Sequence, residues 1–176
     1  LLTALRIIEK MEKSNGVNDP DTVSYNTIFS LLDATSFDAL KEITDGEICR
    51  LKQHGNFADF LISLLDSMKE HGIARDAITY YNAIMACGLD SQDAWEIFRL
   101  CIRDEKFIET ATVKDSQSHL KGRAASGLVF VANAALSVAS ITGDMSVVSK
   151  VVADLSGVGA KMNSESLRHI VRALGN

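Results

Sequence analysis

The sequence predicts an all-α fold built from stacked helical hairpins, and three observations support this prediction. Only 6% of the residues are aromatic and Pro20 is the single proline, whereas β-sandwiches and barrels normally contain more of both. Apolar residues recur at helical spacings along much of the chain, which is typical of amphipathic helices. The order of helix, turn and helix then repeats, so we expect the hairpins to stack on one another.

The first predicted elements are two helices joined by a short turn. An apolar residue occurs at every third position of residues 2–11, with charged residues between them, so this segment is an amphipathic helix. Pro20 stiffens the turn that follows, and Asp21 or Thr22 can cap a second helix over residues 23–32.

Two different segments follow the first hairpin. Residues 34–53 contain a shorter amphipathic piece that Asp45-Gly46 interrupts, and we expect them to form an insertion. Residues 57–68 carry a wide apolar stripe that ends shortly before Gly72. This stripe predicts the clearest helix of the chain, with Gly72 as its C-terminal signal.

The pattern of the first hairpin returns 56 residues later. Tyr25-Asn26 lies nine residues after Gly16, and Tyr81-Asn82 lies nine residues after Gly72. The repeat indicates two hairpins of common ancestry.

A third hairpin and the start of a fourth follow in the C-terminal part. Asn133 lies ten residues before Gly143-Asp144, and an apolar stripe over residues 147–155 comes next. Asn163 then precedes another amphipathic segment, which is the start of a fourth unit. We therefore divide the chain into the following units: the second helix of a preceding repeat and a linker (1–21), repeat 1 with an insertion near 34–53 (22–76), repeat 2 with an insertion near 108–124 (77–127), repeat 3 (128–163), and the first helix of a following repeat (164–176).

These units resemble the pentatricopeptide repeat family. The resemblance lies in a helix-turn-helix of about 35 residues, with Tyr-Asn opening the first helix, Met near the end of the second, and Gly followed by Pro-Asp in the link. It is best over residues 11–32 and 55–87. It implies a right-handed α-solenoid, here a piece of a longer chain, that acts as a non-catalytic binding module without a cofactor. The ligand that the resemblance implies is single-stranded RNA, and the location that it implies is a mitochondrion or a chloroplast.

The resemblance also implies which residues face an RNA strand, because in this family each unit can read one base. The base-facing residues of the first helices would be Asn26, Asn82, Asn133 and Arg168. The residues three positions earlier would pack on the bases: Val23, Thr79, Phe130 and Glu165. A carboxamide suits the first role because it offers two donors and an acceptor to a base edge.

A second specifying position lies just before the next unit. It falls on Asp76 after Asn26 and on Asn163 after Asn133, and in the family both combinations imply a pyrimidine preference. The register of the second unit is open, since its link is one residue longer than usual. Tyr81 is the alternative for its base-facing place, with Ala77 in the linker place.

Net charge limits the RNA prediction. Residues 1–105 carry 10 Lys and Arg against 18 Asp and Glu, or −8, while residues 106–176 carry 8 against 5, or +3. RNA-binding surfaces usually have a basic excess, so Lys121 and Arg123 are the predicted first phosphate contacts. The acidic first part favours a different class of function, a protein-interaction scaffold within a large organellar assembly such as a mitochondrial or chloroplast ribosome.

Other classes of function lack support in the sequence. Residues 124–142 are uncharged over the length of a membrane span, but their small and hydroxyl-bearing side chains favour a closely packed inner helix. The three cysteines have neither disulfide nor zinc spacing, and no common catalytic motif occurs. We therefore expect no enzyme activity, no small-molecule substrate, no metal and no membrane span.

Overall fold

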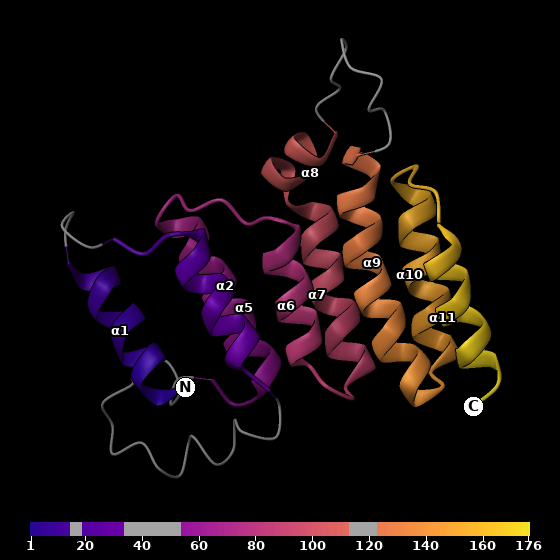
Figure 1. Cartoon of the computed structure of the whole chain (residues 1–176), viewed down its shortest axis with the longest axis horizontal. Helices are drawn as coiled ribbons and strands as arrows, with labels where there is room; N and C mark the ends of the chain where they lie inside the picture. Colours follow the sequence, from indigo (N-terminus) through magenta and orange to yellow (C-terminus); the bar gives the residue numbers. More distant parts are fainter. Residues whose placement is uncertain (15–18, 34–53, 113–122) are drawn as a thin grey trace.

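The computed structural model describes residues 1–14, 19–33, 54–112 and 123–176, and all regular structure in these ranges is α-helical. The prediction of an all-α fold is therefore confirmed. Figure 1 shows the helices as a row of hairpins with α1 at one end and α11 at the other. The helices are α1 (Leu2–Lys13), α2 (Thr22–Leu31), α5 (Phe57–Glu70), α6 (Ala77–Ala86), α7 (Ser91–Arg103), α8 (Glu105–Thr112), α9 (Arg123–Thr142), α10 (Met145–Gly157) and α11 (Ser164–Leu174).

The hairpins stack in two layers. Helices α2, α6, α9 and α11 each pack against the next one in this order, and we call them the A layer. Helices α5, α7 and α10 pack in the same way behind them, each against its partner in the A layer, and form the B layer together with α1, which packs on α2. This arrangement is a solenoid, because each hairpin is stabilised by its neighbours in the row.

Three helices of the A layer begin with the same local structure. In each, the side chain of the N-cap residue accepts a hydrogen bond from the backbone N–H three residues later, and the hydroxyl at that later position accepts one from the N-cap backbone. Such a reciprocal pair satisfies two backbone donors at the start of a helix. The pairs are Asp21 with Ser24, Asp76 with Thr79, and Asn163 with Ser166.

The fourth A-layer helix, α9, lies at the centre of the stack and is lined with small residues. Ala132, Ala135 and Ala139 are fully buried, and α9 contacts α6, α7, α8, α10 and α11. Small side chains allow so many neighbours to approach one helix closely. Within the described part of the chain, no helix is long and apolar enough to cross a membrane.

Buried tyrosines connect the layers. Tyr25 and Tyr80 are both fully buried, and their hydroxyls donate to Glu12 Oε1 at 2.5 Å and to Asp104 Oδ2 at 2.6 Å. Arg75 also pairs with Asp104, at 2.7 Å. Burial, and then the hydrogen bond to the carboxylate, raises the pKa of Tyr80 far above its usual range.

The structure describes the two predicted insertions to different extents. Residues 34–53 lie outside the described residues. Of the segment near 108–124, the first residues belong to α8, a helix that sequence analysis did not identify, residues 113–122 lie outside the described residues, and α9 begins at Arg123. Phe107 anchors α8 because its buried ring packs edge-on against Tyr80, with 5.3 Å between centroids. Gly72 has φ +70°, which suits glycine at the end of α5.

Candidate nucleic-acid interface

The exposed side of the A layer carries two parallel rows of side chains, which together we call the A face. Both rows follow from position in the helix: residues two and five after an N-cap lie three apart and therefore on the same side. The first row holds Val23, Ile78 and Glu165, each two residues after the N-cap of its helix, and Phe130, which lies within the continuous helix α9. Val23, Ile78 and Phe130 are 70%, 54% and 43% exposed. The second row holds Asn26, Tyr81, Asn133 and Arg168.

This alignment decides the register of the second unit. Asn26 lies five residues after the N-cap Asp21, and the residue five after the N-cap Asp76 is Tyr81. The buried tyrosines agree, because Tyr80 is the equivalent of Tyr25. Tyr81, the alternative that the sequence left open, therefore holds the equivalent of the Asn26 position, and Asn82 lies one residue beyond it.

The same shift corrects the row that was expected to pack on bases. Thr79 is fully buried and forms the cap of α6 with Asp76, so it cannot lie against a ligand. Ile78 is the exposed residue at that position. Sequence analysis missed Ile78 because it aligned the first two units on the repeated Tyr-Asn pair, and this alignment shifts the second unit by one residue.

The two predicted pairs across neighbouring units are both brought together. The Nδ2 group of Asn26 donates to Asp76 Oδ1 at 3.3 Å, and the Nδ2 group of Asn133 donates to Asn163 Oδ1 at 3.3 Å. Asp76 and Asn163 can accept because they are the N-caps of the next A-layer helices. Each pair thus joins one A-layer helix to the start of the next.

Asn26 and Asn133 differ in their exposure and in the hydrogen bonding of their side-chain oxygen Oδ1. Asn133 is only 8% exposed, and its Oδ1 accepts a 2.6 Å hydrogen bond from the hydroxyl of Ser166. Both polar atoms of Asn133 are therefore engaged within the chain. Asn26 is half-buried, and its Oδ1 is buried without a hydrogen-bond partner among the described residues. An unsatisfied buried acceptor is costly, so a movement of the half-buried Asn26 side chain that brings this atom to a donor outside the chain would be favourable.

Asn82 lies one residue beyond the row and has a different role. Its Nδ2 group donates to the backbone carbonyl of Asn26 at 3.3 Å. The bond joins α6 to α2 and positions the backbone that carries Asn26.

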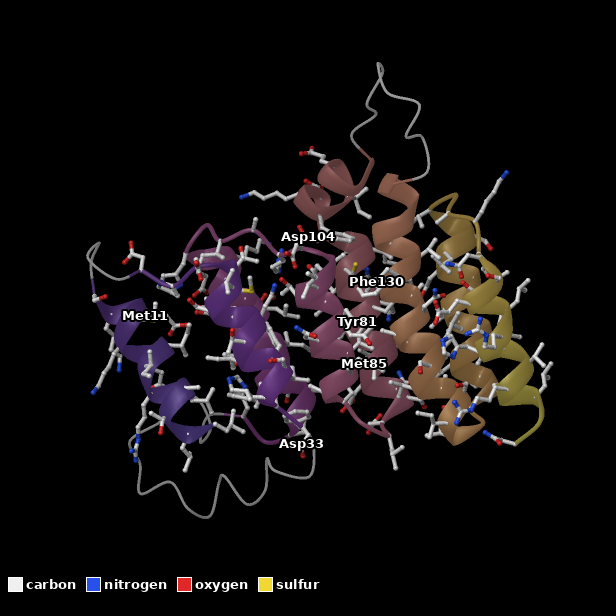
Figure 2. All side chains as sticks on the ribbon, in the orientation of Figure 1. Met11, Asp33, Tyr81, Met85, Asp104 and Phe130 are labelled. Atoms are coloured by element: carbon white, nitrogen blue, oxygen red, sulfur yellow. The ribbon has the colours of Figure 1, made fainter. Side chains whose placement is uncertain are left out.

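The centre of the A face is aromatic. The rings of Tyr81 on α6 and Phe130 on α9 stack with 4.6 Å between centroids and 19° between planes. Figure 2 shows the two side chains next to each other, with Met85 one turn further along α6. Met85 is 39% exposed, so this part of the face is an apolar patch open to solvent.

The C-terminal end of the A face is basic. Arg168 and Arg172 are exposed on α11, one turn apart. Between them, burial lowers the pKa of His169 below its usual value, opposed by Glu165 and aided by the two arginines. His169 is therefore largely neutral at neutral pH, and the arginines supply the positive charge.

The remaining predicted contacts cannot be placed. Lys121 and the side chain of Arg123 lie outside the described part of the chain, although Arg123 begins α9. Within the described ranges, no group of three or more His, Cys, Asp or Glu residues could hold a metal ion.

Comparison with known proteins gives a likeness in structure only. No protein-family model and no curated protein matches the chain. Among solved structures, the chain is similar to the pentatricopeptide repeat protein PPR10 in complex with an 18-nt psaJ RNA element, with 18% identity and a TM-score of 0.40. The match covers 96% of this chain and 24% of that chain. A cysteine-to-serine variant of PPR10 with the same RNA element matches with the same values.

Proposed function

We propose that the A face binds single-stranded RNA and that the protein is a non-catalytic RNA-binding module. The observation that carries this proposal is the pair of rows on four neighbouring helices, one of them apolar on the first three helices and the other able to form hydrogen bonds. Bases of a single strand need both a surface to stack on and groups that read their edges. Neighbouring helices lie about 8–10 Å apart, which an extended strand can span with one nucleotide per unit.

The first unit has the features of a base-reading position. Val23 offers an exposed apolar surface, and Asn26 has an acceptor that no group in the described part of the chain satisfies. A side-chain amide can pair with a base edge that has an N–H donor next to an acceptor, as uracil, cytosine and the purines all do. The pyrimidine preference that the family resemblance implies is assigned to Asn26 together with Asp76.

The charge of the A face sets the expected strength of binding. Arg168 and Arg172 can neutralise phosphates at one end, while the N-terminal part of the chain is acidic. Few phosphates are then neutralised, so affinity should fall only shallowly as salt increases. The family resemblance adds a mitochondrial or chloroplast location to this proposal.

Equilibrium binding to short labelled RNAs tests the proposed function. Wild-type protein should bind a pyrimidine-rich strand better than a purine-rich strand in 50 mM salt. Asn26→Ala should reduce the preference, and Arg168→Ala with Arg172→Ala should weaken all strands and reduce the salt slope by about 2. Absence of RNA binding by the wild-type chain at this salt concentration would refute the proposal.

One observation favours a second candidate function, a protein-interaction scaffold in a large organellar assembly. Four carboxylates lie close enough to repel one another: Asp59 on α5, Asp90 at the N-cap of α7, and Asp93 and Glu96 on α7. Burial, and then the neighbouring carboxylates, raises the pKa of Asp93 to about 6. A basic protein partner would relieve this repulsion. Charge reversal of Asp90 and Glu96 should then release the protein from its native assembly, while RNase treatment should leave the assembly intact.

A further inference from the structure

The second unit departs from its neighbours at the position that Asn26 and Asn133 occupy in theirs. There Tyr81 has a ring in place of an amide, and it stacks on Phe130 of the next unit. The position equivalent to Asp76 and Asn163, the hydrogen-bond partners of the two asparagines, also differs. In the first and third units Asp76 and Asn163 cap the next helix, whereas α9 is a continuous helix across the equivalent position, Leu128.

The second unit therefore lacks groups that could distinguish one base from another. Leu128 is 5% exposed and its side chain offers no donor or acceptor. The only polar atom that Tyr81 presents is one hydroxyl, which is a donor and an acceptor at once and so can pair with any base.

The stacked rings also leave no room for a base between them. Their centroids are 4.6 Å apart, while a base inserted between two rings would require about 7 Å, twice the spacing of about 3.4 Å between stacked bases. A base can stack only on the outer surface of the pair. That surface is accessible, because Phe130 is 43% exposed, and Ile78 and Met85, one turn to either side of Tyr81 on α6, are 54% and 39% exposed.

We propose that Tyr81 and Phe130 form a stacking step that accepts any base, next to the pyrimidine-reading position at Asn26. This inference rests on the proposed RNA-binding function and specifies its sequence requirement: one read base followed by one unread base. Aromatic rings stack on every base because each base has a π-face, and this contact adds affinity without sequence preference.

The arrangement favours a nucleic acid over a protein partner at this patch. Tyr81 continues the row that holds Asn26, and this row leads towards Arg168 and the neighbouring Arg172. Stacking, hydrogen-bonding and phosphate-neutralising groups therefore occur together on the A face. A flat aromatic step beside a carboxamide and two guanidinium groups matches the three parts of a nucleotide.

The test measures affinity for four RNAs of one length that differ only at the base next to the preferred pyrimidine. Wild-type protein should bind all four equally within about twofold. Phe130→Ala should weaken all four by about tenfold, and Tyr81→Phe, which keeps the ring, should change none of them. Leu89→Ala is the matched control, because it removes a 68% exposed apolar side chain outside the two rows and should also have no effect.

Tyr81→Asn completes the test, since it introduces the amide of the neighbouring units and should create a preference among the four RNAs. The inference is overturned if wild-type protein already discriminates among them, or if Phe130→Ala matches Leu89→Ala while wild-type binding is intact. If wild-type protein binds none of the RNAs, the proposed function itself fails. If Phe130→Ala alters only one RNA, the step reads a base and the inference is wrong.

Discussion

Asn133→Ala should destabilise the protein substantially, although Asn133 was first predicted to face RNA. The substitution removes the hydrogen bond from Asn133 Nδ2 to Asn163 Oδ1 and the bond that Asn133 Oδ1 accepts from the buried Ser166 hydroxyl. Each buried hydrogen bond contributes about 1 kcal/mol net. The free energy of unfolding should therefore fall by about 2 kcal/mol, and the midpoint of thermal unfolding by about 4–8 °C for a chain of this size.

Asn26→Ala is a matched control because it changes the same residue type at the equivalent position. Asn26 makes one 3.3 Å hydrogen bond through its side chain, is half-buried, and has an unsatisfied Oδ1 that the substitution removes. Loss of the bond and removal of the unsatisfied atom oppose each other. The free energy of unfolding should change by less than about 0.5 kcal/mol.

Urea denaturation followed by circular dichroism measures both free energies on the same protein preparation. Wild-type protein and Asn26→Ala should have nearly equal free energies of unfolding, and the free energy of unfolding of Asn133→Ala should be well below both. Equal destabilisation by the two substitutions would refute the distinction between a structural asparagine and one available to a ligand. So would an Asn133→Ala protein that keeps its stability but loses its base preference.

Two further predictions concern buried and crowded carboxylates. Asp104→Ala leaves Arg75 and the Tyr80 hydroxyl without their buried partner and should cost about 3–5 kcal/mol of unfolding free energy by urea titration; an unchanged midpoint would contradict this. The pKa of Asp93 is raised to about 6, chiefly by burial and then by Asp90, so the folded state loses stability as pH rises from about 4 to 6. Asp93→Asn should raise the free energy of unfolding at pH 7.5 by about 1 kcal/mol or less, because the group is solvent-screened. This gain should vanish below pH 4, and a gain independent of pH would show another cause.

Much of the fold follows from sequence because each helix carries its own local signals. The apolar stripe of residues 57–68 and the glycine at 72 define α5 almost to its ends, and Asp21 caps α2 as expected. These signals depend on residues within one or two helical turns, so the sequence alone contains them. Helix α8 was missed because its stability depends on a distant contact, the packing of Phe107 against Tyr80.

The candidate site was predicted only in part, and the open register of the second unit shows why. The repeated Tyr-Asn pair favoured Asn82 for the A face, with Tyr81 as the alternative, and the structure has Tyr81 there. A stronger signal was present in the sequence: Asp or Asn followed three residues later by Ser or Thr, as in Asp76 and Thr79, which marks the start of a helix and fixes its register. The different states of Asn26 and Asn133 were beyond sequence analysis, because they depend on which side chains of the neighbouring helix reach the amide.

The most direct test of the account is to find where RNA contacts the protein. A pyrimidine-rich strand containing 4-thiouracil, irradiated in complex with the protein and analysed by peptide mapping, reports the nearest side chains. The account predicts cross-links in peptides that contain Tyr81 of α6 or Phe130 of α9. Cross-links confined to α7 and α10 of the B layer, or a strand that forms none under conditions of saturating protein, would contradict it.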